Sequence, residues 1–296
     1  MSIIEKAIGQ VGAKRAHAGI ERPEPSSDGF HADAAAPSPS TGPTDAASAA
    51  GSGKTVPIDL GRLAAMGFAV APEDGGAQAD DGAHTREEFR LIKRPLLLNA
   101  FGEAAASVPR GNVIMVTSAV AGEGKTFCSI NLALSVAMER DRRVLLVDAD
   151  LQRPMVATTL GIPQGPGLVD LLENPSLDPG EVFVNTSVSR LSVLPAGSRH
   201  QFGTELLASE AMKAFVQELS ERYPDRLVLF DSPPLLAATQ AVVLAGLAGQ
   251  IVMVVGAGST SQEAVTEALG MLDAEKPIGL VLNRYPRVFR PEYYYG

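Results

Sequence analysis

Eight residues near the middle of the chain combine two glycines with a lysine and a threonine, Ala119-Val-Ala-Gly-Glu-Gly-Lys-Thr126. They follow an apolar run, VIMVT (113–117), and open a segment with helical character. A glycine-rich turn in this position points backbone N–H groups and the positive end of the helix dipole at a polyphosphate. Lys125 can then reach the β- and γ-phosphate oxygens, and the Thr126 hydroxyl can bind Mg²⁺. The pattern predicts a P-loop, with Ala119 in place of the usual first glycine.

Two other interpretations of this segment are open. It could be a glycine-rich turn without chemical importance, but the flanking strand and helix are the context that a P-loop requires. It could also bind a dinucleotide, but Gly122 and Gly124 lack the third glycine of the G-x-G-x-x-G pattern. We therefore retain the P-loop as the prediction.

Three carboxylates follow strand-like runs. Asp148 and Asp150 come at the end of VLLVDAD, and Asp231 ends LVLFD. The carboxyl ends of parallel strands meet at one edge of a sheet, where ligands gather. Oxygen ligands for Mg²⁺ and a base that orients the acceptor are what phosphoryl transfer needs. Each acid alone could be a helix cap or a solvated loop residue, but the set predicts a phosphoryl-transfer site.

Three of the five tyrosines lie within the last four residues, Tyr293, Tyr294 and Tyr295. Consecutive tyrosines at a free terminus preceded by proline cannot all point into a core. We interpret them as an accessible substrate tail, and a sticky or disordered end is the alternative. Tyr285 is an open candidate for an additional acceptor.

The elements that must position these residues alternate between strand-like and helical segments. Helical segments are expected at about 125–140 and 206–221. The strand-like runs are VIMVT (113–117), VLLVD (144–148), LSVLP (191–195), LVLFD (227–231), IVMVV (251–255) and IGLVLN (278–283). Strands separated by helices predict an α/β fold with a mostly parallel sheet flanked by helices. The apolar stretch 241–258 approaches the length of a membrane span, but Gly249-Gln250 divides it into a helical half and a strand half.

Four regions follow from composition. Residues 1–17 include a short amphipathic helix, and residues 18–84 form a disordered linker because they hold few large apolar side chains. Within that linker, 56–70 could be a transient or partner-bound element. The folded domain spans 85–288 and begins with a helix, EEFRLIK, that precedes Pro95. The tyrosine tail occupies 289–296.

Charge and cysteine content exclude several classes of protein. The formal net charge of -9 argues against a general nucleic-acid binder. Cys128 is the single cysteine, so neither an intrachain disulfide framework nor a cysteine-ligated cluster is expected. The four histidines lie far apart without metal-ligand spacing, and the first residues are too interrupted by charge for a signal peptide.

Three segments resemble the motifs of the bacterial tyrosine kinases, which are related to ParA/MinD ATPases. GEGKT resembles their Walker A motif, VLLVDADLQRP their Walker A′ motif and LVLFDSPP their Walker B motif. The resemblance covers about 87–296. It is strongest to the exopolysaccharide-locus, XrtA (PEP-CTERM)-associated autokinases, through SIIEKA, EEFRLIKRPLL, LPAG and ELLAS. It implies a P-loop NTPase fold with ATP and Mg²⁺ as cofactors.

The resemblance also implies residue roles. Lys125 and Thr126 would contact phosphate and Mg²⁺, and Asp150 and Asp231 would hold Mg²⁺ directly or through water. Asp148 would be the base toward the incoming tyrosine hydroxyl. Asn283 would contact adenine, although a turn former at a strand end is an alternative. The implied nucleotide contacts are Ala121, Gly122, Glu123, Gly124, Lys125, Thr126, Phe127 and Asn283.

A motif for ring assembly in the family, E-x-x-R-x-x-R, has a counterpart before the P-loop. Glu87 and Arg90 match it, Lys93 occupies the second arginine position, and Arg94 follows. Arg90 and Arg94 are four residues apart and share a helical face. A ring-forming homo-oligomer is the expectation, and a solvated charged helix is the alternative.

Several positions depart from related families. Val120 stands where ParA/MinD ATPases carry a signature lysine, and the chain lacks the cysteines of iron–sulfur carriers. Gln152 in the A′ motif and Gln240 after the B motif replace residues that are usually charged, which could slow turnover.

The resulting expectation is an ATP-dependent protein-tyrosine autokinase that phosphorylates its own tail and regulates exopolysaccharide biosynthesis or export. The resemblance implies a membrane activator of the chain-length-determinant type. The kinase would then be cytoplasmic and peripheral to the inner membrane through that partner. The rival functions are a ParA/MinD-like positioning ATPase without kinase activity and a nucleotide-switched scaffold.

Overall fold

The computed structural model describes residues 55–70, 80–174, 176–198 and 203–285. The chain divides into two units, Met1–Ala49 and Ala50–Gly296, and all described residues belong to the second. The expected helix within 1–17 and the tyrosine tail 289–296 lie outside the described residues.

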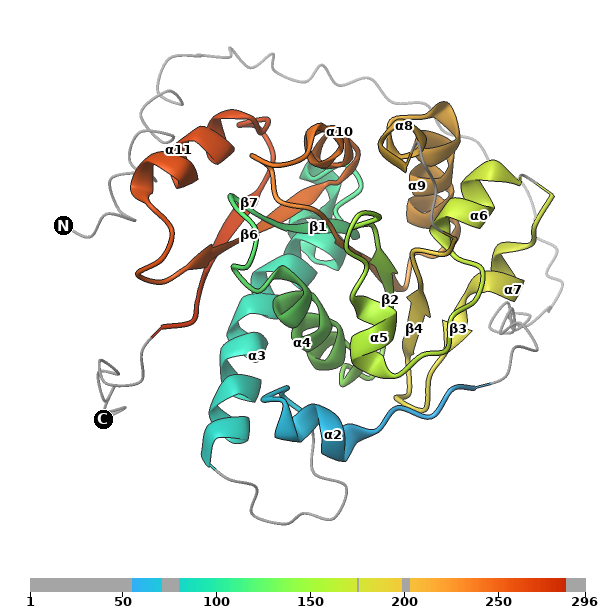
Figure 1. The fold of residues 1–296 in the computed structure, drawn as a ribbon, viewed down its shortest axis with the longest axis horizontal. Coiled ribbons are helices and arrows are strands. Elements are labelled where there is room, and N and C mark those ends of the chain that lie inside the picture. Colours follow the sequence, from blue (N-terminus) through green and yellow to red (C-terminus); the bar gives the residue numbers. More distant parts are fainter. Residues whose placement is uncertain (1–54, 71–79, 175, 199–202, 286–296) are drawn as a thin grey trace, which may run out of the picture. The chain divides into compact units, whose positions relative to one another are not determined.

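A seven-stranded sheet forms the centre of this unit (Figure 1), in the order β3-β4-β2-β5-β1-β6-β7. All neighbouring strands pair in parallel except β3 and β4, which are antiparallel. The strands are β1 (Val113–Ser118), β2 (Arg143–Asp148), β3 (Val184–Asn185), β4 (Leu191–Leu194), β5 (Arg226–Asp231), β6 (Gln250–Gly256) and β7 (Ile278–Asn283). The predicted mostly parallel α/β sheet is confirmed. Its six predicted strands are present, because buried parallel strands leave continuous apolar runs in the sequence.

Helices cover both faces of the sheet. Two apolar clusters result, one beneath α3 and α4 and the other beneath α8 to α11. Figure 1 shows α3 and α4 side by side, and the two helices are in contact. The helices are α2 (Leu60–Ala65), α3 (Asp80–Phe101), the 3₁₀ helix η2 (Glu103–Ser107), α4 (Lys125–Ala137), α5 (Val156–Leu160), α6 (Leu168–Glu173), α7 (Pro179–Val182), α8 (Gly203–Leu207), α9 (Glu210–Arg222), α10 (Thr239–Leu247) and α11 (Gln262–Gly270).

The helix α3 differs from its prediction at both ends. It begins at Asp80 rather than near Arg86, and Pro95 lies inside it rather than after it. A proline in a helix interior removes a hydrogen bond and costs about 3 kcal/mol. Phe89 and Leu96 are both buried, on either side of the proline. We infer that burial on both sides of Pro95 offsets its cost, so the helix continues.

Residues 55–70 are packed against the domain, so the prediction of a disordered linker from 18 to 84 is wrong for this stretch. Val56 forms a parallel β-bridge with Thr186, and α2 follows with Leu63 almost fully buried. Phe68 and Val70 are also buried. The composition of the whole 18–84 region is poor in apolar residues, and this average hides a short segment that has enough of them to pack.

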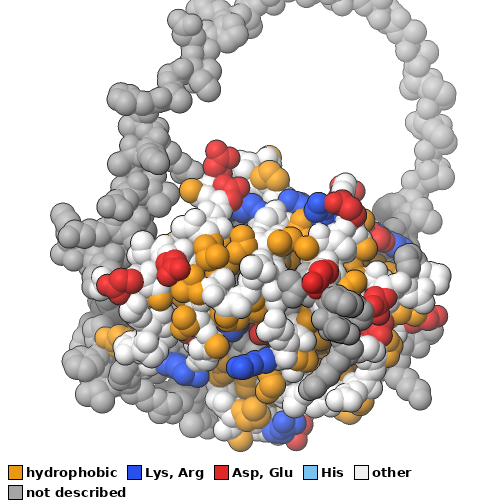
Figure 2. Space-filling model, turned by 45° about the horizontal axis from the view of Figure 1, so that its top comes forward, with side chains coloured by type: hydrophobic (Ala, Val, Ile, Leu, Met, Phe, Trp, Pro, Cys, Tyr) orange, Lys and Arg blue, Asp and Glu red, His pale blue; other side chains and the backbone are white. Residues whose placement is uncertain are grey.

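No helix in the described ranges is long and apolar enough to span a bilayer. The apolar stretch 241–258 instead contributes to α10 and β6, as its division at Gly249-Gln250 predicted. On the face seen in Figure 2, lysine and arginine side chains lie among acidic, hydrophobic and uncharged ones.

Candidate active site

The predicted P-loop connects β1 to α4 and takes its shape from two glycines. Gly122 and Gly124 have φ values of 86° and 96°, the left-handed region that favours glycine. A Cβ at Gly124 would also collide with the side chain of Asn283. Ala119 is fully buried and is not among the residues with positive φ, so alanine fits there without strain.

The Glu123 side chain is buried, so its predicted contact with the nucleotide would have to be made by its backbone. The side chain is 2% exposed, and its carboxylate accepts hydrogen bonds from Val120 N at 2.8 Å and Gly256 N at 2.9 Å. The Thr260 hydroxyl donates a third bond, at 2.5 Å. Glu123 therefore connects the P-loop to the end of β6, and only its backbone is left to face a phosphate.

Lys125 and Thr126 form the first turn of α4. The Thr126 hydroxyl donates to Asp231 Oδ2 at 2.7 Å, and the Ser129 hydroxyl donates to Asp231 Oδ1 at 2.9 Å. Ser129 was missed in the sequence, although its position three residues after Thr126 puts both hydroxyls on one helical face. The P-loop helix and the end of β5 are thus joined through one carboxylate.

The three predicted carboxylates lie at the same edge of the sheet. Asp148 and Asp231 are register partners at the ends of the adjacent strands β2 and β5. Asp150 lies two residues after Asp148 in the chain and is half-buried. Burial raises the pKa of both Asp150 and Asp231, and the positive charge of Lys125 partly offsets that rise at each of them. The sheet topology therefore brings the predicted lysine, threonine and acids together.

Asp231 is 1% exposed, and burial raises its pKa to about 6 despite the bonds from Thr126 and Ser129. A divalent cation beside Asp231 would favour its charged form. The oxygen atoms of Thr126, Asp150 and Asp231 are the kind of ligand that Mg²⁺ prefers, so this donor set fits the ion. Among the described residues, no three His, Cys, Asp or Glu side chains are grouped closely enough to hold a metal by themselves.

Asp148 is fully enclosed in this conformation. Its Oδ2 accepts a hydrogen bond from Val156 N at 3.0 Å, whereas its Oδ1 is buried and has no hydrogen-bond partner among the described residues. Burial, followed by the nearby Asp231 carboxylate, raises the pKa of Asp148 well above its ordinary value. For Asp148 to act as the predicted base, the segment that follows β2 must move to admit a tyrosine hydroxyl.

Replacing Asp148 with Asn is expected to stabilise the nucleotide-free protein by about 1 kcal/mol or more, because a neutral amide replaces a buried and incompletely bonded carboxylate. The folded state binds the Asp148 proton more tightly than the unfolded chain does. Wild-type stability is therefore lost as pH rises from the ordinary Asp pKa through the raised one. Thermal unfolding at acid pH and at pH 8 should show the gain of Asp148→Asn at the higher pH only.

The control for this prediction is Asp225→Asn, which removes one partner of an exposed ion pair with Arg143 and should change the stability little. An equal gain for Asp148→Asn at both pH values would contradict the prediction.

The side chains of two other predicted nucleotide contacts, Phe127 and Asn283, already have partners within the protein. The Phe127 ring packs on the Phe68 ring, with centroids 4.9 Å apart, and so faces the apolar cluster beneath α4. Asn283 Nδ2 donates to the backbone oxygen of Glu123 at 2.8 Å. The predicted adenine contact of Asn283 would have to be made alongside this bond or in its place. Gln152 is exposed, and Gln240 is buried in α10.

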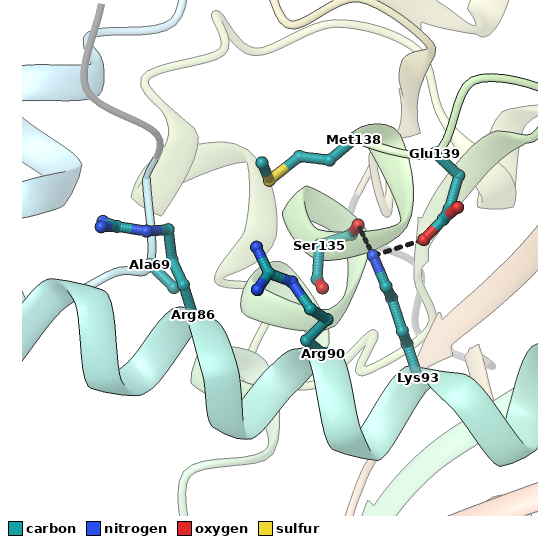
Figure 3. A pocket seen from close by; sticks show the side chains of 7 residues that line it. All are labelled: Ala69, Arg86, Arg90, Lys93, Ser135, Met138 and Glu139. Atoms are coloured by element: carbon teal, nitrogen blue, oxygen red, sulfur yellow. Dashed lines mark hydrogen bonds and ion pairs between the residues drawn. The ribbon is translucent and has the colours of Figure 1, made fainter. Parts of the chain in front are cut away.

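The expected assembly motif on α3 is only partly available to a neighbouring subunit. Figure 3 shows Lys93 pointing at Ser135 and Glu139, with its Nζ 2.7 Å from Ser135 O and 2.6 Å from Glu139 Oε1. The Lys93 side chain is 8% exposed, so its expected contact with another subunit is wrong for this conformation. Arg90 pairs with Glu87 on the helix surface, and Arg94 is exposed.

The family model of the CobQ/CobB/MinD/ParA nucleotide binding domain matches residues 114–291. This range contains the P-loop, the three carboxylates and all seven strands except the first residue of β1. The chain therefore belongs to this family of nucleotide-binding domains.

Relatives narrow the assignment within that family. The chain is 34% identical to tyrosine-protein kinase YwqD of Bacillus subtilis over 214 aligned residues. These residues make up 71% of this chain and 86% of the relative. It is 31% identical to tyrosine-protein kinase ptk of Acinetobacter johnsonii, over 62% of this chain but only 25% of that longer relative. The solved VpsO kinase domain superposes with a TM-score of 0.59 at 30% identity, covering 71% of this chain and all of the domain. The chain is a member of the bacterial tyrosine kinases, and the resemblance to that family predicted from its motifs is confirmed. The narrower resemblance to the exopolysaccharide-locus, XrtA-associated autokinases stays a prediction.

Proposed function

We propose that this kinase transfers the γ-phosphoryl group of ATP to Tyr293, Tyr294 and Tyr295 of another copy of the chain. The observation that carries the proposal is the Thr126–Asp231–Ser129 hydrogen-bonded group, which joins the P-loop helix to the acidic edge of the sheet. A loop that fits phosphate and a set of oxygen ligands that fits Mg²⁺ are thereby placed side by side.

Positioning and charge neutralisation supply most of the catalysis in phosphoryl transfer. The tyrosine oxygen forms a bond to the γ-phosphorus, the bond to the β–γ bridging oxygen breaks, and ADP leaves. Lys125 neutralises phosphate charge, and Asp148 accepts the phenolic proton once it is accessible. Thr126, Asp150 and Asp231 would hold Mg²⁺, which supplies further charge neutralisation when bound.

Partners and cellular role rest on the sequence resemblance. We propose that a membrane protein of the chain-length-determinant type activates the kinase and keeps it at the inner membrane. Glu87, Arg90 and Arg94 would take part in a ring of subunits without Lys93. Each phosphotyrosine adds about 1.5 to 2 negative charges. On a chain with a net charge of -9, this charge would weaken docking of the tail and allow a cycle of assembly and release in exopolysaccharide synthesis.

Changing Tyr293, Tyr294 and Tyr295 together to Phe is expected to abolish phosphorylation of the tail and to leave ATP binding unchanged, because Phe lacks the acceptor hydroxyl. Mass-spectrometric mapping of phosphotyrosine after incubation with ATP and Mg²⁺ measures the first effect, and titration with a fluorescent ATP analogue measures the second. Tyr285→Phe is the matched control and separates the tail from an additional acceptor. An unmodified wild-type tail in the presence of the activator would refute autophosphorylation. ATP hydrolysis that is unaffected in the triple variant would then favour a positioning ATPase.

A further inference from the structure

The segment 55–70, which we call the strap, connects one edge of the sheet to the first turn of α4. At its start, Val56 N donates to Asn185 O at 2.9 Å, and Val56 O accepts from Ser187 N at the same distance. Ile58 N donates to the Ser187 hydroxyl oxygen, also at 2.9 Å. The beginning of the strap is therefore fixed beside β3, at the end of the sheet farthest from β7.

The middle of the strap is the helix α2, which has its own stabilising contacts. Asp59 caps the helix by accepting a hydrogen bond from Arg62 N at 2.8 Å. Leu63 is 1% exposed and belongs to the apolar cluster beneath α3 and α4. The strap is thus held beside β3 and again at Leu63, before its end packs against the first turn of α4.

The end of the strap packs on Phe127, the residue that follows Thr126. The Phe68 ring lies 4.9 Å from the Phe127 ring, and the Phe89 ring of α3 lies 6.5 Å from Phe127 in an edge-on arrangement. Phe68 is 5% exposed although it lies in a segment outside the sheet and its main helices. Phe127 is therefore held by one ring from the strap and one from α3.

A hydrogen-bonded connection runs parallel to the ring contact. Ala69 N donates to Asn131 Oδ1 at 2.7 Å, and Asn131 Nδ2 donates to Phe127 O at 2.9 Å. Arg86 of α3 donates to Val70 O at 2.9 Å. The strap backbone is linked in this way to the first turn of α4 and to α3.

The first turn of α4 has a particular need for such support. On its N-terminal side it follows Gly122 and Gly124, which have the least conformational restriction of any residue type. Thr126 and Lys125 must nevertheless be held to within a fraction of an ångström to act on a phosphate, since a displacement of 1 Å can cost about a hundredfold in rate. Phe127 adds to the support that Thr126 receives from Asp231, because it is held on the side of the turn that faces the strap and α3.

We propose that Phe68 is a positioning residue for nucleotide binding: the strap holds Phe127, and through it keeps Lys125 and Thr126 aligned with the phosphates. Phe68 acts through Phe127 and does not touch the nucleotide. The proposal deepens the role given above to the P-loop helix and rests on it. On this proposal, residues 55–70 contribute to nucleotide binding by the kinase.

The test compares Phe68→Ala with Phe68→Leu and Leu63→Ala in the full chain. Leu63→Ala removes a side chain of α2 in the strap that is also buried, and it leaves the ring contacts of Phe127 with Phe68 and Phe89 in place. Titration with a fluorescent ATP analogue and Mg²⁺, KM for ATP, kcat and thermal unfolding are measured for each. We expect Phe68→Ala to raise Kd and KM about tenfold with a much smaller fall in kcat, as loss of alignment predicts. Phe68→Leu, which keeps the burial and loses the ring contact, should give a smaller rise, and Leu63→Ala should lower the Tm with KM unchanged.

Two results would overturn the proposal. One is an unchanged KM in both Phe68 variants while the Tm falls, which would give the strap a structural role alone. The other is an equal rise of KM in Leu63→Ala, which would make the effect one of general stability. If Phe68→Ala does not fold, Phe68→Leu decides between these results. Failure of the proposed function looks different, because the wild-type chain would then bind no ATP analogue or leave its tail unmodified.

Discussion

Replacing Lys125 with Met is expected to lower autophosphorylation by about a hundredfold to a thousandfold, the usual effect of removing one charge-stabilising group from a transition state. The Lys125 side chain is 8% exposed and lies in the first turn of α4. Burial raises the pKa of both Asp150 and Asp231, and the Lys125 ammonium group opposes that rise at each carboxylate. Without it, the site would keep its acids and lose the cation that attracts phosphate. The loss should appear in kcat as well as in KM, because charge on the transferring phosphoryl group is neutralised in the transition state.

Methionine is suited to this test because it keeps an unbranched side chain of similar length in a buried position. Phosphotyrosine formation over time, with ATP varied, measures the effect, and thermal unfolding checks the fold. Lys213→Met provides the control, since Lys213 lies on α9 in an exposed ion pair with Glu210. A Lys125→Met variant that kept wild-type kcat would show that the P-loop lysine does not act in the transfer step.

Replacing Glu123 with Ala is expected to have the second largest effect. Two backbone N–H groups, of Val120 and Gly256, would lose their buried acceptor, at about 1 to 3 kcal/mol each. The P-loop would also lose its attachment to the end of β6. We therefore expect both a lower Tm and a fall in kcat/KM for ATP of about a hundredfold, because a misplaced loop no longer aligns with the phosphates.

The amide variant separates charge from shape at this position. Glu123→Gln keeps the size of the side chain, but its NH₂ group must face one of the two backbone N–H donors. Because a donor facing a donor forms no bond, Glu123→Gln should also impair nucleotide binding. Thr260→Val, which removes only the hydroxyl donor, should have a much smaller effect. Nucleotide affinity that is unchanged in Glu123→Ala, measured on folded protein, would contradict a positioning role for Glu123.

The sequence by itself determined those features that depend on residues close together in the chain. The P-loop was predictable because its glycines, lysine and threonine are consecutive and stand between a strand and a helix. The three acids were predictable because each ends an apolar run, and parallel strands end at a common edge. The sheet followed for the same reason, since a buried parallel strand is apolar on both faces.

The tertiary structure decided which side chains of those motifs face the ligand. Glu123 belongs to the P-loop by position, but its carboxylate bonds Gly256, 133 residues away. Lys93 occupies an assembly position, but its ammonium group bonds Ser135, 42 residues away. No local spacing reveals such a partner, because a buried polar group takes whichever acceptor or donor the fold brings to it.

The strap is an entire segment whose contacts could not be predicted from local sequence. Residues 55–70 lie within a region whose composition predicts disorder, and the segment is too short to build a core of its own. Its apolar residues are ordered because α3, α4 and the end of the sheet provide surfaces for them to bury against. The ordering free energy of the strap therefore comes from distant parts of the chain, and this is why only the folded structure could place Phe68 against Phe127.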